Sequence, residues 1–115
     1  MSIKYKDHDV LLNFVPYSST GNTALEILDE NSNLSLEVVT VNITQPLPKD
    51  IIMIKQLDNT DETISNLINA GIILPEPQGE YDIGYTNVIA YKLSSFADNI
   101  RKKQYNLYKY ESLYK

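Results

Sequence analysis

Apolar and polar residues alternate over much of the first half of the chain, and this period of two is typical of half-buried β-strands. Polar clusters rich in Asp, Asn, Ser and Gly separate the alternating segments, and these residue types favour turns. The pattern predicts a hairpin followed by a third strand: strands over residues 3–6, 10–15 and 23–28, with turns or loops over 7–9, 16–22 and 29–33.

A β-branched run extends from residue 34 to residue 43. Because β-branched residues suit a pleated sheet, we expect this run to form the central strand of an antiparallel sheet. The residues expected to share one face of it are Leu34, Leu36, Val38 and Thr40. Pro46 and Pro48 end the strand, since proline cannot donate a hydrogen bond to a neighbouring strand.

A short buried strand at residues 51–55 precedes the clearest helical pattern. Asn59 and Glu62 have the spacing of a capping box at a helix N-terminus. Gly71 is placed to end the helix as a C′ glycine. The apolar stripe of this helix consists of Ile64, Leu67 and Ile68. A stripe of this width covers one face of a sheet.

The segment 75–80 contains two prolines and is typical of a stiff acidic loop, and residues 82–93 are expected to form the final strand. Within that strand, Val88 and Ala90 point away from the face that carries Tyr91. We therefore expect both faces of the final strand to be partly covered.

From Ser95 the apolar residues follow a helical period, which predicts an amphipathic C-terminal helix. Ser95 and Asp98 have the spacing of a second capping box. We expect Phe96 and Ile100 to pack on the chain's own sheet. The apolar residues close to one helical face are Phe96, Ile100, Leu107 and Tyr114.

Together these elements predict an α+β fold: a bent antiparallel sheet or small barrel-like β core, one covering helix and a C-terminal helix. The chain has 115 residues, which is enough for one domain with a hydrophobic core. We expect a single α+β domain over residues 1–95 and a basic, Tyr-rich C-terminal helix or tail over residues 96–115.

The chain contains no cysteine, which excludes disulfides, thiolate metal sites and a cysteine nucleophile. The N-terminal residues lack the apolar segment of a signal peptide. The longest apolar stretches are far shorter than the roughly 20 residues that span a bilayer. From these features we expect a cytoplasmic protein that makes no membrane contact.

Charge is divided unevenly along the chain. Residues 1–100 contain five Lys or Arg and fourteen Asp or Glu, a net charge of −9, whereas residues 101–115 contain five basic residues and one acid, a net charge of +4. The same last fifteen residues hold four of the nine tyrosines. An acidic body disfavours non-specific binding of the body to DNA, and a basic aromatic tail favours a binding role.

Residues suited to catalysis are scarce. The single histidine lies in the sequence Asp7-His8-Asp9, which we interpret as solvated turn residues rather than an oriented acid–base pair. The acidic cluster at 58–62 lacks the alternating spacing of a calcium loop and instead favours the helix macrodipole. No nucleotide-binding glycine motif or activated-serine motif is present in the sequence. We therefore expect no catalytic, metal-binding or cofactor-binding residues and no enzyme activity.

The tail combines basic residues with aromatic rings. Tyrosine offers a large amphipathic contact area at low entropic cost, and the basic residues supply charge for an acidic partner or a phosphate group. The predicted partner-binding residues are Arg101, Lys102, Lys103, Tyr105, Tyr108, Tyr110 and Tyr114. Two alternatives stay open: the tail packs on its own body, or its rings stack on nucleobases.

Four segments carry a resemblance to known sequences: residues 23–29, 40–43, 67–73 and the closing strand with Gly84 and Leu93. Their order, over about residues 10–93, resembles that of a family of short proteins of uncharacterised function encoded by phages and conjugative elements of gut-type bacteria. The resemblance implies a mobile-DNA setting, where small acidic proteins often block host machinery or regulate transfer genes. It assigns no functional residues, and the tail lies outside it.

The leading hypothesis is therefore a non-enzymatic interaction protein of a mobile element, acting as a small acidic inhibitor of a host defence or regulatory protein. The alternative is a small RNA-binding regulatory protein of a plasmid or phage, in which the basic tail follows the phosphates. A third hypothesis makes the tail a homodimer contact.

Overall fold

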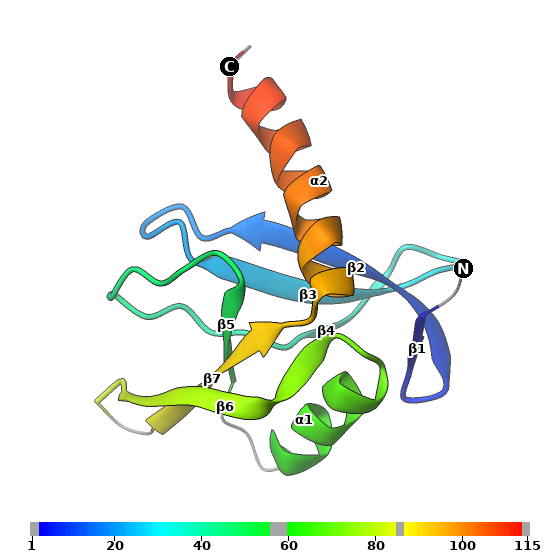
Figure 1. Cartoon of the computed structure of the whole chain (residues 1–115). Helices are drawn as coiled ribbons and strands as arrows, with labels where there is room; N and C mark the ends of the chain where they lie inside the picture. The colour runs from blue at the N-terminus through cyan, green and yellow to red at the C-terminus, as the bar shows by residue number, and fades with distance from the viewer. Residues whose placement is uncertain (1–2, 56–59, 85–86, 114–115) are drawn as a thin grey trace.

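The computed structural model describes residues 3–55, 60–84 and 87–113, with side chains described up to residue 106. Two antiparallel sheets and two helices form the fold (Figure 1). Sheet A has the strand order β1 (Ile3–Tyr5), β2 (His8–Pro16), β3 (Thr23–Asp29) and β4 (Ser35–Val38). Sheet B has the order β5 (Ile51–Ile54), β7 (Asn87–Leu93) and β6 (Ile73–Asp82). The helices are α1 (Thr60–Asn69) and α2 (Ser95–Leu113).

The segment 39–41 connects the two sheets by main-chain hydrogen bonds. The amide of Val39 donates to the carbonyl of Leu25 in β3 at 3.1 Å, and the carbonyl of Val39 accepts from the amide of Lys55 at 2.9 Å. The amide of Val41 donates to the carbonyl of Met53 in β5 at 3.1 Å. The predicted α+β class, with one covering helix and a C-terminal helix, is thus confirmed, and the β core consists of two antiparallel sheets joined at one segment.

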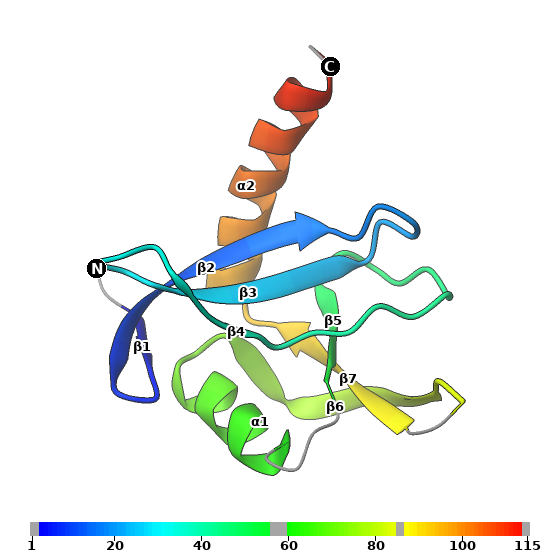
Figure 2. The same ribbon diagram turned by 180° about the vertical axis from the view of Figure 1, so that it is seen from behind.

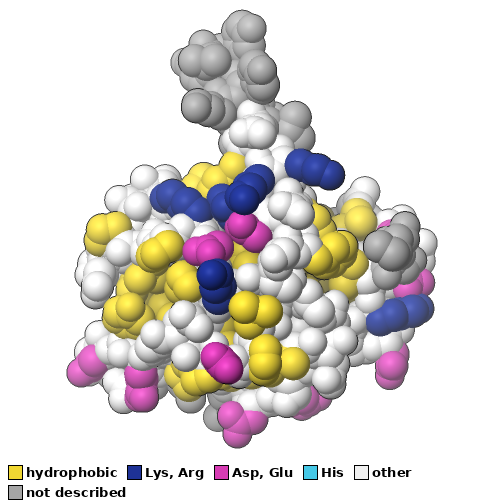
Figure 3. Space-filling model, viewed as in Figure 1, with side chains coloured by type: hydrophobic (Ala, Val, Ile, Leu, Met, Phe, Trp, Pro, Cys, Tyr) yellow, Lys and Arg dark blue, Asp and Glu magenta, His cyan; other side chains and the backbone are white. Residues whose placement is uncertain are grey.

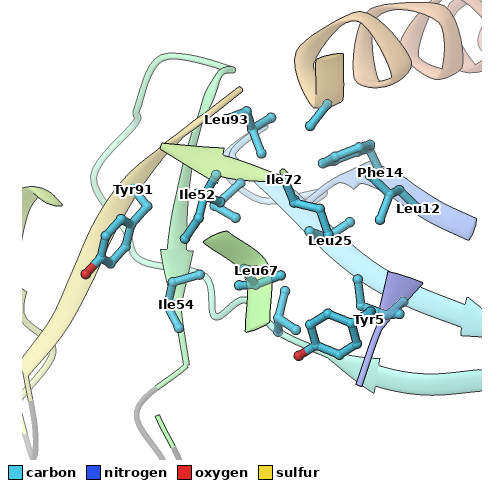
Figure 4. Close-up of a cluster of buried hydrophobic side chains, with 14 of the residues drawn as sticks. Tyr5, Leu12, Phe14, Leu25, Ile52, Ile54, Leu67, Ile72, Tyr91 and Leu93 are labelled. Carbon is cyan, nitrogen blue, oxygen red and sulfur yellow. The ribbon is translucent and has the colours of Figure 1, made fainter. Parts of the chain in front are cut away.

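The core lies between the two sheets and is closed on one side by α1 (Figure 4). Each sheet contributes alternate residues of its strands, and α1 contributes Leu67 from its predicted stripe. The labelled core residues in Figure 4 are Tyr5, Leu12, Phe14, Leu25, Ile52, Ile54, Leu67, Ile72, Tyr91 and Leu93. A smaller cluster on the other face of sheet B contains Val88 and Ala90. Both faces of β7 are therefore covered, as its sequence predicts.

The C-terminus of α1 explains why Gly71 ends it. Gly71 has φ +75°, a conformation that glycine adopts without strain. Its amide donates to Ile68, and the amide of Ile72 donates to the carbonyl of Leu67, both at 3.0 Å. These are the two bonds of a Schellman motif, and the buried pair Leu67 and Ile72 supplies its apolar contact. The predicted N-cap, Asn59, lies outside the described residues.

The first hairpin has a tighter turn than the sequence predicts. Tyr5 pairs with His8, so only Lys6 and Asp7 form the loop. Both have positive φ, +50° and +65°, as a type I′ turn requires. His8 and Asp9 therefore belong to β2, which corrects the turn predicted over residues 7–9.

The prediction for residues 34–43 is wrong about the place of the strand in the sheet and about which of its two faces is buried. The strand β4 is short and lies at the end of sheet A, not at its centre. The leucine and valine side chains expected in the core are exposed: Leu34 by 68%, Leu36 by 43% and Val38 by 40%. The inward positions are instead Glu37, whose carboxylate accepts a 2.9 Å hydrogen bond from the Tyr5 hydroxyl, and the buried Val39.

The acidic loop predicted over residues 75–80 belongs to strand β6. Its register against β7 shifts between Ile73 and Pro77 and again between Pro77 and Gly79. Prolines are tolerated in an edge strand and at bulges because their missing amide does not face a paired neighbour. The last strand, β7, consequently starts at Asn87 and not at residue 82.

The N-cap of helix α2 is Ser94, one residue before the Ser95 that the sequence predicts. The Ser94 hydroxyl accepts from the amide of Ala97 at 3.1 Å and donates to the carbonyl of Gly71 at 2.6 Å. Ser94 is therefore the N-cap, and it ties the start of α2 to the end of α1. The predicted partners of a capping box, Ser95 and Asp98, both lie inside the helix.

Candidate functional site: the outer face of sheet A and the helix beside it

The helix α2 lies along the part of β2 that extends beyond β1, where one edge of β2 would otherwise be open (Figure 1). Gln104 closes this edge. Its amide nitrogen donates to the carbonyl of Leu12 at 2.7 Å, and its carbonyl oxygen accepts from the amide of Phe14 at 2.6 Å. One side chain thus supplies the donor and the acceptor that a neighbouring strand would supply.

Arg101 faces the body and is 7% exposed. Its Nε donates to the carboxylate of Asp98 at 2.7 Å, and its guanidinium lies 5.0 Å from the ring centre of Tyr105. Partial burial disfavours ionisation of Asp98, but the hydrogen bond and charge of Arg101, followed by those of Lys102, lower the pKa of this carboxyl. Arg101 is held inside its own chain.

The remaining predicted partner-binding residues are separated by the structure. Lys102 and Lys103 are exposed, although Lys102 lies 3.4 Å from the Asp98 carboxylate. Tyr105 is half-buried, and its hydroxyl donates to Thr23 at 3.0 Å. The side chains of Tyr108 and Tyr110 and all of Tyr114 lie outside the described part of the chain. Of the described members, Lys102 and Lys103 are exposed, whereas Arg101 and Tyr105 are directed toward the body.

The outer face of sheet A carries exposed apolar side chains on neighbouring strands. Leu11 and Leu28 are cross-strand neighbours of β2 and β3, and Val38 lies opposite Glu26 on the same face. Leu36 sits at the bulge of β4 and is also exposed. Sheet B covers only the inner face of sheet A, so this apolar surface is available for contact.

A hollow of about 430 Å³ lies where this outer face meets α2. Its apolar walls include Leu11 and Leu28 from the sheet and Phe96 and Ile100 from the helix. Leu11 is 40% exposed and Phe96 is 42% exposed. Ile100 packs against the core, as predicted, whereas Phe96 is exposed at the edge of the hollow. In Figure 3, basic side chains gather where α2 meets the body, beside hydrophobic side chains.

The sequence alone did not identify the outer face of sheet A as a site. Alternation in residues 34–41 shows that two faces exist, but it does not show which face is buried. The residue types of this segment give no signal for the exposed face, because the structure directs the charged Glu37 inward, where it accepts a hydrogen bond from Tyr5, and leaves Leu36 and Val38 exposed, opposite to the usual preference.

The chemistry available elsewhere is limited. His8 lies in β2 and is exposed. Over residues 3–55, 60–84 and 87–113, no three His, Asp or Glu side chains gather as metal ligands. Neither α1 nor α2, as far as the structure describes them, has the length and apolar character that a bilayer-spanning helix requires.

Comparison of the chain with protein-family models, with curated proteins and with solved structures gives no match.

Proposed function

We propose that this chain is a non-enzymatic interaction protein that acts by binding another protein. In the mobile-element setting implied by the resemblance, it is a small acidic inhibitor of a host defence or regulatory protein. The observation that supports this proposal is the exposed apolar surface formed by Leu36 and Val38 of β4 and by Leu34, which lies just before the strand.

The strands at the ends of the two sheets differ in a way that favours a binding role for β4. Edge strands of soluble proteins usually carry charged residues, prolines or bulges that discourage association. The edge strand β6 contains Pro75 and Pro77, and β1 exposes Lys4. The strand β4 has a bulge at Leu36 and one charged residue, Glu37, but Glu37 is directed inward and the strand contains no proline, so its outward positions Leu36 and Val38 are apolar. This exposed surface is unfavourable in water, and a bound partner would remove the cost.

The apolar surface of β4 suits a protein segment that pairs or packs with it. An extended segment can add to a sheet edge through main-chain hydrogen bonds, with alternate side chains giving specificity. Glu26, which lies opposite Val38 on the outer face, favours a partner segment that carries a basic residue as well as apolar ones.

RNA binding is less well supported by the geometry. Arg101 is buried, and Lys102 shares the Asp98 carboxylate with it. Among the described residues of the basic triplet, only Lys103 is exposed without an ion pair. A phosphate-binding surface needs several accessible cations. RNA binding is therefore the less favoured alternative, and the experiment below also tests it.

The experiment is capture from host lysate by tagged full-length protein. The test variant is Leu36→Glu with Val38→Glu. The control is Leu74→Glu, because Leu74 is 41% exposed, like the two test residues, but lies on β6. We expect a nuclease-resistant protein to be retained by the natural sequence and the control and lost from the test variant, with an unchanged Tm for all three.

Equal retention by the test variant would contradict the proposed role of β4. Capture of RNA alone, lost in Lys103→Glu, would replace the proposal with the RNA-binding alternative.

A further inference from the structure

The two ends of β4 are fixed to β3 by main-chain hydrogen bonds. At one end, the amide of Asp29 donates to the carbonyl of Leu34 at 2.8 Å. At the other end, the amide of Val39 donates to the carbonyl of Leu25 at 3.1 Å. Figure 2 shows β4 beside β3, with the chain continuing past β5. Any rearrangement of β4 that keeps the fold must keep both of these ends in place.

Between the fixed ends, the two strands differ in length by one residue. The strand β3 contributes the three residues 26–28, and β4 contributes the four residues 35–38. One residue of β4 must therefore bulge out of the pairing, and in the structure this residue is Leu36. The fixed ends require a bulge, but they do not determine which residue forms it.

The bulge at Leu36 directs a charged side chain inward. Glu37 lies opposite Ile27, which is fully buried on the inner face, and residues directly opposite one another share a face. Leu36 is left 43% exposed. An inward carboxylate and an outward leucine each reverse the usual preference. A specific contact must therefore stabilise this arrangement.

That contact is the hydrogen bond between Tyr5 and Glu37. The Tyr5 hydroxyl donates to the Glu37 carboxylate at 2.9 Å, and Lys6 Nζ lies 3.5 Å from the same carboxylate. Tyr5 is only 2% exposed. Burial, and then the hydrogen bond and charge of Glu37, raise the pKa of Tyr5, so its hydroxyl remains a donor. If Glu37 turned outward, this buried hydroxyl would lose its acceptor at a cost in free energy.

Moving the bulge from Leu36 to Val38 would exchange the two faces without disturbing the fixed ends. Leu36 would then lie opposite Ile27 and face the core, and its removal from water is favourable. Glu37 would lie opposite Glu26 on the outer face, and two carboxylates directly opposite one another repel. The two positions of the bulge are thus each supported by one interaction and opposed by another.

We propose that β4 has two arrangements, with the bulge at Leu36 or at Val38. The hydrogen bond from Tyr5 and the charge of Glu26 hold the bulge at Leu36. In this arrangement Leu36 and Val38 both face outward and can contact a partner protein. In the other, Leu36 is withdrawn and Glu37 takes its place on the surface. This control of binding rests on the function proposed above, whereas the existence of two arrangements does not.

The first test is relaxation-dispersion NMR on the purified full-length protein. We expect exchange on the μs–ms timescale at the amides of residues 26–28 and 35–38, with a minor population of about 1–10%. Leu36→Glu removes the gain from burying the leucine and should abolish this exchange. The matched control Leu74→Glu alters a leucine of similar exposure on β6 and should leave the exchange unchanged.

The second test is a double variant, Tyr5→Phe with Glu26→Gln, which removes both features that favour the bulge at Leu36. We expect the equilibrium to shift at least about tenfold toward the other arrangement. Nuclear Overhauser contacts across the strands identify the arrangement, because Leu36 replaces Glu37 as the residue opposite Ile27.

The control for the second test is Tyr17→Phe, which removes a hydroxyl that lies 3.0 Å from the Thr40 hydroxyl and should leave the bulge where it is. Flat relaxation profiles over residues 26–28 and 35–38 of the natural sequence would overturn the proposal. So would a folded double variant that still has the natural pairing of β3 with β4. These measurements need no partner, so a failure to capture protein from lysate would count against the proposed function alone.

Discussion

Gln104 has a structural role that no pattern in the sequence indicates. Its carboxamide donates to Leu12 and accepts from Phe14, so both ends of the side chain are required. Gln104→Glu keeps the size and the acceptor but removes the donor and sets a carboxylate against the Leu12 carbonyl. We expect a loss of about 2 kcal/mol in the free energy of unfolding at pH 7, measured by urea denaturation.

The control for this change is Lys103→Gln, which alters an exposed neighbour on the same helix. We expect the control to change stability by less than about 0.5 kcal/mol. A loss of similar size in both variants would mean that helix propensity, and not the contact with β2, accounts for the effect.

Asp98 makes a pH-dependent contribution to stability. Since Arg101 and Lys102 lower its pKa from the ordinary value of 3.8, the ionised form is favoured in the folded state. The stabilisation is fully present well above pH 3.8 and disappears as the pH falls through the folded-state pKa. Asp98→Asn should therefore cost about 1–2 kcal/mol at pH 7 and progressively less as the pH falls below 3.8, as followed by urea denaturation at several pH values. A constant difference over this range would rule out ionisation as the cause.

At the scale of elements, the first hairpin offers a stabilising change. Its two turn residues both have positive φ, and Asp7 pays a steric cost for a conformation that glycine adopts freely. Asp7→Gly should raise stability by about 0.5 kcal/mol, or about 2–3 °C in Tm, since the favoured turn ends in glycine. Asp7→Ala is the control, and it should lower stability because alanine keeps the steric cost and lacks the short polar side chain that can hydrogen-bond locally in this conformation. The same sign for both variants would contradict the type I′ geometry.

Helices and strands that are specified by residues close together in the sequence were predictable. The apolar stripe and Gly71 specify α1 and its end, and the alternation in residues 10–15 and 23–28 specifies the pairing of β2 with β3. Position in the sheet was not predictable, because β4 and a central strand share the same alternation. The strand character of 75–80 was hidden because prolines in an edge strand resemble those of a loop.

The candidate sites were likewise predictable only where residues close together in the sequence define them. Basic and aromatic composition located α2 as a feature of interest, and Lys102 and Lys103 are exposed there. Composition could not show that Arg101 and Tyr105 are directed to the body, because this depends on the rotation of α2 against β2. The hollow beside Phe96 joins residues far apart in sequence, so only the folded chain reveals it.

For the whole molecule, the boundary between domain and tail lies within α2. Ala97 and Arg101 are buried, and Gln104 closes β2, so the first half of the helix belongs to the fold. A chain ending at residue 106 should keep its Tm within about 3 °C, whereas one ending at residue 99 should lose more than about 3 kcal/mol. Thermal unfolding followed by circular dichroism measures both. Equal stability of the two chains would place the boundary before α2, near residue 95.

The main-chain link at residues 39–41 has a consequence for motion. Because Val39 bonds to β3 and to the residue after β5, and Val41 bonds to β5, neither sheet can separate from the other without breaking these bonds. Local opening of one sheet alone is therefore costly. The amide protons of Val39, Val41 and Lys55 should exchange with solvent deuterium at nearly one common slow rate, set by complete unfolding of the chain.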